Sequence, residues 1–419
     1  MKAHVVIDAG YGDSGKGLMT DYFCSLYDSD RVLNIKVNGG CQAGHTACVL
    51  DKISNRYNIN VFHTLGSGTF RGVDTFLASK FILNIKYLNE ELKKFEHDFG
   101  WKPIVLASEQ CRIQFKIDEE LNHRIEEARS NKHGTCGKGI YETVNRHHQN
   151  LGIQLYKVYD RFIANEKEKL CDKISELSLQ YIEYREQFLK DSENLSINTQ
   201  DLKDDIDKYS KETVDDIWEF LQERKNQFCM TTFDRIIASE KYEVLVFECS
   251  QGLELNWGDK RNTPHTTASH TGLTNVVKEI KQSKKGEPIE NIEICYVTRS
   301  YKTKHGAGNF VELDSSIIDE WGLYDKTNRP NKFQGTLAYG KIDRQRMTEL
   351  INTDFKQLDS LDIPIKTKSL AVTHLDQTNE AVLENTGETF FKDFNAHNTI
   401  NGEKTYYSFG EKATDIITE

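Results

Sequence analysis

The organisation of this chain follows from residues 4–17, which read His4-Val5-Val6-Ile7-Asp8-Ala9-Gly10-Tyr11-Gly12-Asp13-Ser14-Gly15-Lys16-Gly17. The apolar run at residues 5–7 predicts a short strand that is buried on both faces. From Gly15 onward, apolar residues recur at helical spacing, and Leu18, Tyr22 and Leu26 form one such row. A strand, a glycine-rich turn and a helix in succession predict a helix N-terminus that faces a phosphate.

The glycine-rich turn matches the phosphate-loop pattern G-x-x-x-x-G-K from Gly10 to Lys16, but Gly17 follows where that pattern has Ser or Thr. In the ordinary motif the hydroxyl holds magnesium, while backbone N–H groups and the lysine hold the phosphates. Here Asp13 places a carboxylate inside the loop, where it can bind magnesium or act as a base beside the transferred phosphoryl group. The structural alternative is a loop aspartate that only caps the following helix.

The composition excludes several classes of protein. The formal net charge of −11 argues against general nucleic-acid binding, which needs clustered Lys and Arg. No apolar run approaches the ~20 residues that span a membrane, and a strand at the very start leaves no room for a signal peptide. Nine cysteines without a Cys-x-x-Cys pair indicate reduced thiols, so a cytoplasmic protein is expected.

Further short apolar runs predict a mainly parallel sheet covered by helices, and these runs lie at residues 32–37, 103–107, 244–247, 292–297 and 370–373. Between about residues 165 and 226 the chain is instead rich in Lys, Glu and Asp. In that segment Val214, Ile217, Trp218 and Leu221 keep a helical spacing. We interpret it as a helical hairpin that packs on the sheet and turns an acidic face to solvent; a partner-binding coiled coil is the alternative.

A series of motifs resembles the adenylosuccinate synthetase family. The loop GDSGKG and the later NGGCQAGHT at residues 38–46 are similar to the family's GDEGKGK and GGxNAGHT. Further matches follow in the same order at residues 66–69, 134–139, 247–252, 266–269, 306–308 and 373–376. The resemblance implies one α/β domain over residues 1–419. It would include a helical subregion at 160–235 and a donor-base and aspartate-binding region at 325–419.

The resemblance also implies a reaction in two stages. A nucleoside triphosphate, GTP in the family, phosphorylates the 6-oxygen of IMP, and the amino group of L-aspartate then displaces that phosphate to give adenylosuccinate. The 6-oxo group leaves only after ring N1 loses a proton and the oxygen gains a phosphoryl group. The site therefore needs a base, an acid and a cation, which is Mg²⁺ in the family.

The family motifs assign these tasks to residues of this chain. The catalytic residues are Asp13 as base, His45 as general acid, Lys16 at the phosphates and Gln251 at the 6-phosphoryl group. Magnesium is assigned to Asp13 and the backbone carbonyl of Gly44. The donor triphosphate is expected at Gly12, Ser14, Gly15, Gly17, Thr46, His374, Asp376, Ser408 and Gly410. The monophosphate and aspartate are expected at Gln42, Thr135, Cys136, Arg146, Thr267, Thr327 and Arg329.

Departures from the family pattern bear first on the acceptor and the amino acid. Cys136 stands where the family has Thr, and a thiol is a poor hydrogen-bond donor. Gln42 replaces Asn. The aspartate-binding loop retains Arg329, which can clamp a carboxylate in bidentate fashion. Arg146 lies where the family sends an arginine across a two-fold interface, which implies a homodimer.

Other departures leave the donor and the acceptor open. Asp376 can accept both N–H groups on the edge of guanine, which favours GTP, but His374 and Glu411 keep ATP or dATP open. Some viral relatives act on dGMP and have a smaller residue in place of the loop aspartate; this chain keeps Asp13, which favours IMP. A relative that acts on GMP or dGMP is one alternative, and a non-catalytic nucleotide switch is another. No Asn-Lys-x-Asp guanine signature supports the switch.

Overall fold

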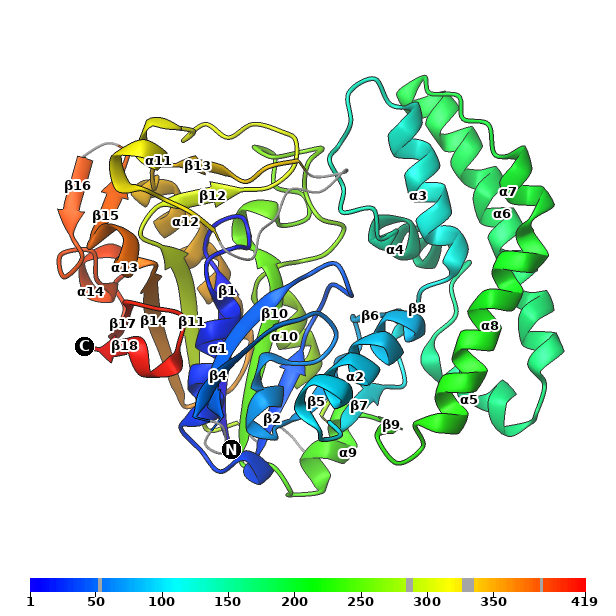
Figure 1. Cartoon of the computed structure of the whole chain (residues 1–419), viewed down its shortest axis with the longest axis horizontal. Helices are drawn as coiled ribbons and strands as arrows, with labels where there is room; N and C mark the ends of the chain where they lie inside the picture. Colours follow the sequence, from blue (N-terminus) through cyan, green and yellow to red (C-terminus); the bar gives the residue numbers. More distant parts are fainter. Residues whose placement is uncertain (52–54, 284–288, 326–334, 385–386) are drawn as a thin grey trace.

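The computed structural model describes residues 1–51, 55–283, 289–325, 335–384 and 387–419 of the chain. Ten strands form a central sheet in the order β18-β17-β14-β11-β1-β10-β2-β5-β7-β9 (Figure 1). Every neighbouring pair in this sheet is parallel except β17 with β18. The strands are β1 (Lys2–Asp8), β2 (Val32–Lys36), β5 (Asp74–Leu77), β7 (Val105–Ser108), β9 (Phe228–Thr231), β10 (Val244–Gly252), β11 (Asn291–Arg299), β14 (Ile365–Thr373), β17 (Lys404–Ser408) and β18 (Ile416–Thr418). The predicted α/β fold with a mainly parallel sheet is confirmed.

Helices cover both faces of this sheet, and four two-stranded sheets surround it. The helices are α1 (Lys16–Ser25), α2 (Ile85–Phe99), α3 (Lys116–Ala128), α4 (Ile140–His148), α5 (Leu155–Ile163), α6 (Lys167–Glu193), α7 (Gln200–Asp204), α8 (Ile206–Glu223), α9 (Phe233–Ala238), α10 (Leu273–Ile280), α11 (Ser316–Trp321), α12 (Arg344–Phe355), α13 (Leu375–Thr378) and α14 (Ala396–Ile400). The small sheets pair β3 (His45–Asp51) with β4 (Arg56–Phe62), β6 (Ile82–Leu83) with β8 (Arg112–Ile113), β12 (Lys302–Lys304) with β13 (Ala338–Gly340), and β15 (Glu380–Leu383) with β16 (Gly387–Phe390). No helix within the described ranges is long and apolar enough to cross a membrane.

Strand β1 is buried on both faces, as its apolar run predicts. Val5 and Ile7 belong to a core that includes residues of α10 and α12, whereas Val6 shares a core with Met19 and Phe23 of α1. Because β1, β10, β11 and β14 are parallel neighbours, their carboxyl ends lie at the same edge of the sheet. Ligands of open α/β sheets bind at that edge.

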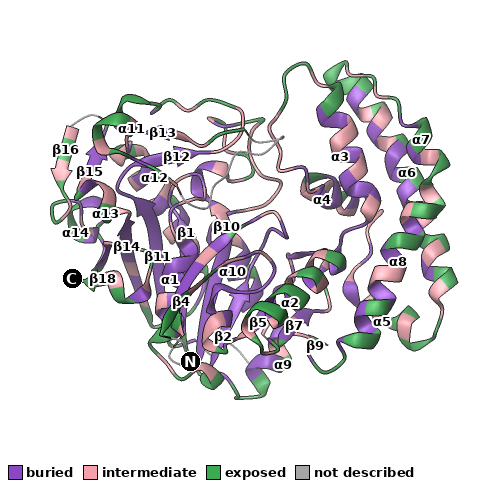
Figure 2. Ribbon diagram, viewed as in Figure 1, coloured by how far each residue is buried: buried purple, intermediate pink, exposed green. Residues whose placement is uncertain are grey.

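The segment between residues 165 and 226 forms the predicted helices, with α6 and α8 packed against each other. Val214, Ile217, Trp218 and Leu221 are all buried, as expected for a hairpin that packs within the chain. Helix α8 packs mainly on α2 and α3, and its Phe220 also contacts Phe228 of β9 at the edge of the central sheet, with ring centroids 5.0 Å apart. Figure 2 shows the buried strands of the sheet and the exposed outer faces of α6 and α8. We call α3 to α8 the helical lobe.

Candidate active site

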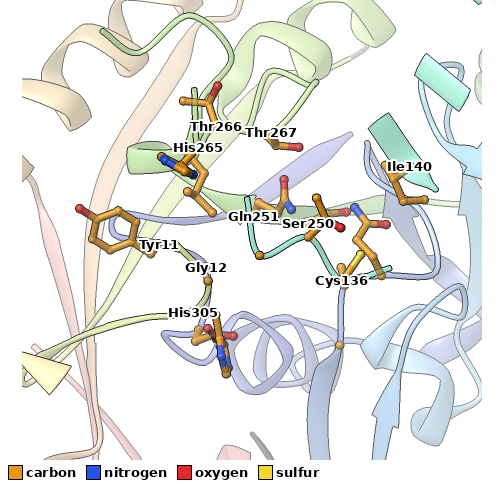
Figure 3. A pocket seen from close by; sticks show the side chains of 18 of the residues that line it. Tyr11, Gly12, Cys136, Ile140, Ser250, Gln251, His265, Thr266, Thr267 and His305 are labelled. Carbon is orange, nitrogen blue, oxygen red and sulfur yellow. Dashed lines mark ion pairs between the residues drawn. The ribbon is translucent and has the colours of Figure 1, made fainter. Parts of the chain in front are cut away.

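A cavity of about 850 Å³ lies at the carboxyl edge of the sheet. Its walls come from the loops that follow β1, β10, β11 and β14, from the start of β3, and from α4 and α6 of the helical lobe. Figure 3 shows Ser250 and Gln251 near its centre, with Tyr11 and His305 to one side and Cys136 and Ile140 to the other. The cavity therefore joins segments that lie far apart in the sequence.

Most predicted site residues line this cavity: Gly12, Asp13, Gly15, Lys16, Gly17, Gln42, Gly44, His45, Thr46, Thr135, Cys136, Gln251, Thr267, His374, Asp376 and Gly410. Ser14 and Ser408 are buried beside it. The N–H of Ser14 is turned toward Asp8, and the hydroxyl of Ser408 donates to the carbonyl of Gly410 at 2.7 Å. Thr327 and Arg329 lie outside the described residues.

The phosphate loop is braced by a carboxylate that the sequence motifs did not single out. Asp8, at the end of β1, accepts the N–H groups of Gly10 at 2.8 Å, Gly12 at 3.1 Å and Ser14 at 2.8 Å. Its Oδ2 also lies 3.6 Å from Nζ of Lys16. Several groups that an ordinary phosphate loop offers to a ligand are therefore engaged within the protein, and Lys16 has its charge balanced before any phosphate arrives.

The absence of the usual hydroxyl after Lys16 has a packing cause. A Cβ at Gly17 would lie 2.3 Å from the carbonyl oxygen of Thr46 in β3. Only glycine fits so close to a neighbouring backbone. The approach brings β3, which carries the predicted general acid, against the start of α1.

Asp13 occupies the cavity wall with a carboxylate that is 24% exposed. Its Oδ2 lies 3.8 Å from Nε2 of His305, and its backbone oxygen accepts a hydrogen bond from Nε of Arg299 at 2.5 Å. Burial raises the pKa of Asp13, while His305, Arg299 and Lys16 oppose that rise. A carboxyl with a raised pKa holds a proton more readily, which suits a general base.

His45 lines the same cavity and is buried in a charged network. Its Nδ1 contacts the carboxylate of Glu248 on β10, and Nζ of Lys36 lies 3.4 Å from the same nitrogen. Glu248 also accepts the hydroxyl of Ser67 at 2.6 Å. Burial and the charge of Lys36 lower the pKa of His45 to about 4, so its imidazole is neutral at neutral pH. To act as an acid, His45 must gain a proton when an anionic ligand binds nearby.

The expected monophosphate wall carries polar groups without protein partners. Both amide atoms of Gln42 are buried, and neither has a hydrogen-bond partner among the described residues. The hydroxyl of Thr135 donates to Oδ1 of Asn122 at 3.3 Å, and burial raises the pKa of Cys136. A buried polar atom without a partner costs free energy, which a ligand's polar groups would offset.

The expected donor-base wall is formed by the end of β14 and by the residues after β17. His374 adopts a left-handed backbone conformation with φ of 62°, and its Nδ1 shares a hydrogen bond with Oγ1 of Thr373 at 2.8 Å. Thr373 in turn donates to the carbonyl of Ser14 at 2.8 Å. Asp376 follows on α13 and is exposed to the cavity. The contact through Thr373 fixes this wall relative to the phosphate loop.

Arg146 requires a correction. Its side chain has no exposed surface, and Nε and Nη2 donate to Asp118 at 2.9 and 2.8 Å. The same guanidinium donates to the carbonyls of Leu151 and Ile113, both at 3.0 Å. A side chain enclosed in this way cannot reach a second subunit, so the predicted substrate-binding role is wrong and Arg146 is a structural residue.

Replacing Arg146 by methionine is expected to lower the free energy of unfolding by ~3–5 kcal/mol, because Asp118 would be left as an unpaired buried charge. Urea unfolding measures this change. The double variant Arg146→Met with Asp118→Asn removes both charges and should recover much of the loss. A stable Arg146→Met protein that binds the monophosphate poorly would restore the binding role.

Magnesium fits the oxygen donors at this site. The Asp13 carboxylate is partly exposed at the cavity, and the exposed backbone of Gly44 lies on the same cavity. Carboxylate and carbonyl oxygens are the ligands that Mg²⁺ prefers. The remaining positions of a magnesium ion would fall to water and substrate phosphates.

The motifs assigned no role to Asp8, Lys36, Glu248 and His305, whereas Arg299 was considered from the sequence as a compensating positive charge beside residues 306–308. A signal for three of them was present in the sequence, because Asp8, Lys36 and Glu248 interrupt apolar runs that predict buried strands. A charge in such a strand needs a partner close by. No comparable pattern marks His305, whose position depends on the path of the loop after β12.

The fold and the site define an enzyme that handles nucleotides, with a carboxylate in its phosphate loop and a buried histidine on the same cavity. The sequence profile described as adenylosuccinate synthetase matches residues 5–323. The adenylosuccinate synthetase of Thermoplasma volcanium is 25% identical over 78% of this chain and 69% of its own length. That of Neurospora crassa is 24% identical over 99% of this chain and 92% of its own length.

Two solved structures share the fold. The fully ligated adenylosuccinate synthetase of Plasmodium falciparum has a TM-score of 0.69 at 16% identity and covers 100% of both chains. The succinoaminodeoxyadenylate synthetase of cyanophage S-2L, bound to dGMP and dATP as an energy donor, has a TM-score of 0.60 at 12% identity. It covers 99% of this chain and 95% of its own. The chain belongs to the adenylosuccinate synthetase family. It is a purine nucleotide ligase that forms a C–N bond, in a nucleotide-dependent reaction that uses magnesium.

Proposed function

We propose that this ligase uses GTP to phosphorylate the 6-oxygen of IMP and joins L-aspartate at that carbon, giving adenylosuccinate, GDP and phosphate. The observation that carries the proposal is the gathering of Asp13, His45 and Gln251 around one cavity, with the amide of Gln42 on its wall, unpaired within the described part of the chain. A base, an acid and a neutral donor in one enclosed space are what the two stages need.

In the first stage Asp13 takes the proton from N1 of IMP, so that the 6-oxygen attacks the γ-phosphoryl group. Gln251 offers its amide N–H groups to the transferred phosphoryl oxygens. Bound Mg²⁺ supplies positive charge against the phosphate oxygens. Enclosure by the cavity walls limits hydrolysis of the phosphorylated purine by water.

In the second stage the amino group of aspartate attacks C6 and phosphate leaves. His45 then protonates the leaving phosphate, using the proton that it gains when the anionic ligands bind. Glu248 holds the Nδ1 side of the ring, and Nε2, which lies 3.3 Å from the backbone oxygen of Ser250, exchanges that proton with the phosphate. Asp376 reads the donor base by accepting two N–H groups of guanine. The homodimer remains a prediction from the family resemblance. The buried Arg146 no longer supports it.

A substrate panel tests the proposal. The protein is mixed with Mg²⁺, L-aspartate and either GTP or ATP, and with IMP, GMP or dGMP in turn, and the products are identified by mass. IMP with GTP should give adenylosuccinate. GTP should exceed ATP by roughly ten- to a hundredfold in kcat/KM, because adenine leaves one hydrogen-bonding group unpaired.

Two other results would replace the proposal. Product from GMP or dGMP alone would support the alternative acceptor, which the fold of the cyanophage enzyme also accommodates. Triphosphate hydrolysis that needs neither a monophosphate nor aspartate would indicate a nucleotide switch.

A further inference from the structure

Arg185 on α6 is a cavity residue to which neither the motifs nor the proposed mechanism gives a role. Its side chain is 2% exposed, yet its Nη1 has no hydrogen-bond partner among the described residues. Each Lys and Arg side chain that lines the described part of the cavity has an acidic partner: Lys16 pairs with Asp8, Arg129 with Glu126 and Glu193, Arg299 with Asp325, and Arg185 with Glu142. Among their nitrogens, only Nη1 of Arg185 is buried without a hydrogen-bond partner in the described ranges. Arg185 therefore keeps unused donor capacity at the wall.

The Arg185 guanidinium is held rigidly on its other side. Nε and Nη2 donate to the two oxygens of Glu142 on α4, at 2.8 and 3.1 Å. The hydroxyl of Tyr181 donates to the same carboxylate at 2.6 Å. The rings of Tyr141 and Phe188 flank the guanidinium, with centroids 5.5 and 5.4 Å from its Cζ. A donor fixed in this way loses little entropy when it binds a ligand.

The first turn of α4 lies at the same wall. Gly139 caps this nine-residue helix with φ of 66°, and Gly139, Ile140, Tyr141 and Glu142 all line the cavity. The first N–H groups of a helix have no intrahelical acceptor, and the helix dipole favours an anion there. Glu142 is the negative charge nearest to these N–H groups in the sequence, and its carboxylate is engaged by Arg185.

We propose that Nη1 of Arg185 and the first turn of α4 bind the 5′-phosphate of the purine nucleoside monophosphate, so that the phosphate site is completed within one chain. The segment at residues 134–139, the expected monophosphate loop, leads directly into this helix. A guanidinium compensates for the weak donor Cys136. Because Glu142 balances its charge, Arg185 contributes a fixed hydrogen-bond donor to the phosphate rather than net positive charge. The proposal takes from the proposed function only that the acceptor is a purine monophosphate.

Equilibrium binding tests the proposal without catalysis. The dissociation constants of IMP, GMP and dGMP are measured by calorimetry alongside those of inosine, guanosine and deoxyguanosine. In Arg185→Gln the tightest-binding monophosphate should bind roughly ten- to a hundredfold more weakly, typical of a lost bond to a charged group, while its nucleoside binds as before. Because Arg185→Gln strands Glu142 in a buried position, the double variant Arg185→Gln with Glu142→Gln is measured as well. Arg124→Gln is the matched control, since it removes an arginine of α3 that pairs with Asp201 instead.

The outcomes separate this inference from the proposed function. Unchanged monophosphate binding in the double variant would overturn the inference. An equal loss of affinity for the monophosphate and its nucleoside would also overturn it. So would a wild-type protein that binds none of the three monophosphates. Selective loss of the monophosphate supports it. If that loss is seen while no acceptor gives an aminated product, the proposed function fails and the phosphate site stands.

Discussion

The variant Asp13→Asn is expected to lose turnover by at least ~10²-fold, the typical cost of removing a general base. Asparagine keeps the size of the side chain but cannot take a proton from N1 of the purine. It also offers magnesium a neutral oxygen instead of a charged one. The loop itself should persist, because its backbone N–H groups are held by Asp8 rather than by Asp13.

The measurement is single-turnover formation of product at saturating triphosphate and monophosphate, with triphosphate binding determined separately. Binding should fall far less than turnover, because Lys16 and the α1 N-terminus remain in place. Nearly normal turnover would mean that Asp13 serves only as a structural cap. The variant Asp8→Asn is a useful contrast, because Asp8 braces the loop: its replacement should lower the thermal midpoint, which Asp13→Asn should leave nearly unchanged.

The second large effect is expected at His45. Replacing it by asparagine should lower kcat by ~10²–10⁴-fold, the range for loss of a proton-transferring side chain. The variant keeps a polar group beside Glu248 but has no ring nitrogen that can carry a proton to the leaving phosphate. The drop should be steeper in the aspartate-dependent step than in phosphoryl transfer, since the departure of phosphate belongs to that step.

His63 provides the control for His45, since it is another histidine of the cavity and its Nδ1 bonds to the backbone oxygen of Ala43 at 2.9 Å. His63→Asn should retain most of the activity. Rapid-quench measurement of GDP and adenylosuccinate formation separates the two stages. Equal losses in His63→Asn and His45→Asn would show that the cavity needs a histidine side chain for packing and not for proton transfer.

The charged network around His45 also illustrates how burial and partners compete. Burial alone would raise the pKa of Glu248, but Lys36 and His45 hold it well below its usual range. The carboxylate is therefore ionised and can support a protonated His45. Burial and Lys36 keep that histidine neutral in the absence of ligand. In the proposed mechanism, phosphate oxygens that bind beside His45 raise its pKa, so the acid forms only in an occupied site.

Local sequence was sufficient for the strand–turn–helix unit around residues 4–25. An apolar run predicts a buried parallel strand, and the spacing of Leu18 and Tyr22 predicts a helix. Both signals lie within a few neighbouring residues, so they can be read from the sequence without the fold. Helices α6 and α8 were predicted for the same reason, because apolar residues recur at helical spacing along α8 and the segment of α6 has the composition of a helix. Strands β5, β9, β17 and β18 were not predicted, because their three to five residues are too few to show a period and none of them was recognised as an apolar run like those of β2 and β7.

Motif order along the chain determined the family, and the short motifs that contain Asp13, Lys16, His45 and Gln251 predicted most of the residues that line the cavity. It did not determine what each side chain contacts. Arg146 sits in a plausible motif position, yet Asp118, which lies 28 residues earlier, encloses its guanidinium. Sequence spacing cannot reveal a partner that tertiary packing selects.

The tertiary structure alone decided which charges are balanced and which remain available. The bracing of the phosphate loop by Asp8, the neutral state of His45 and the unpaired Nη1 of Arg185 each depend on side chains from different elements meeting in a low-dielectric interior. Coulombic and desolvation energies depend on distance and burial, which one-dimensional spacing does not encode. The sequence by itself therefore determined the mainly parallel character of the sheet, the phosphate loop and the family. Which hydrogen-bond donors remain available to a substrate is decided by the tertiary structure, because only folding brings α4, α6 and the edge of the sheet together.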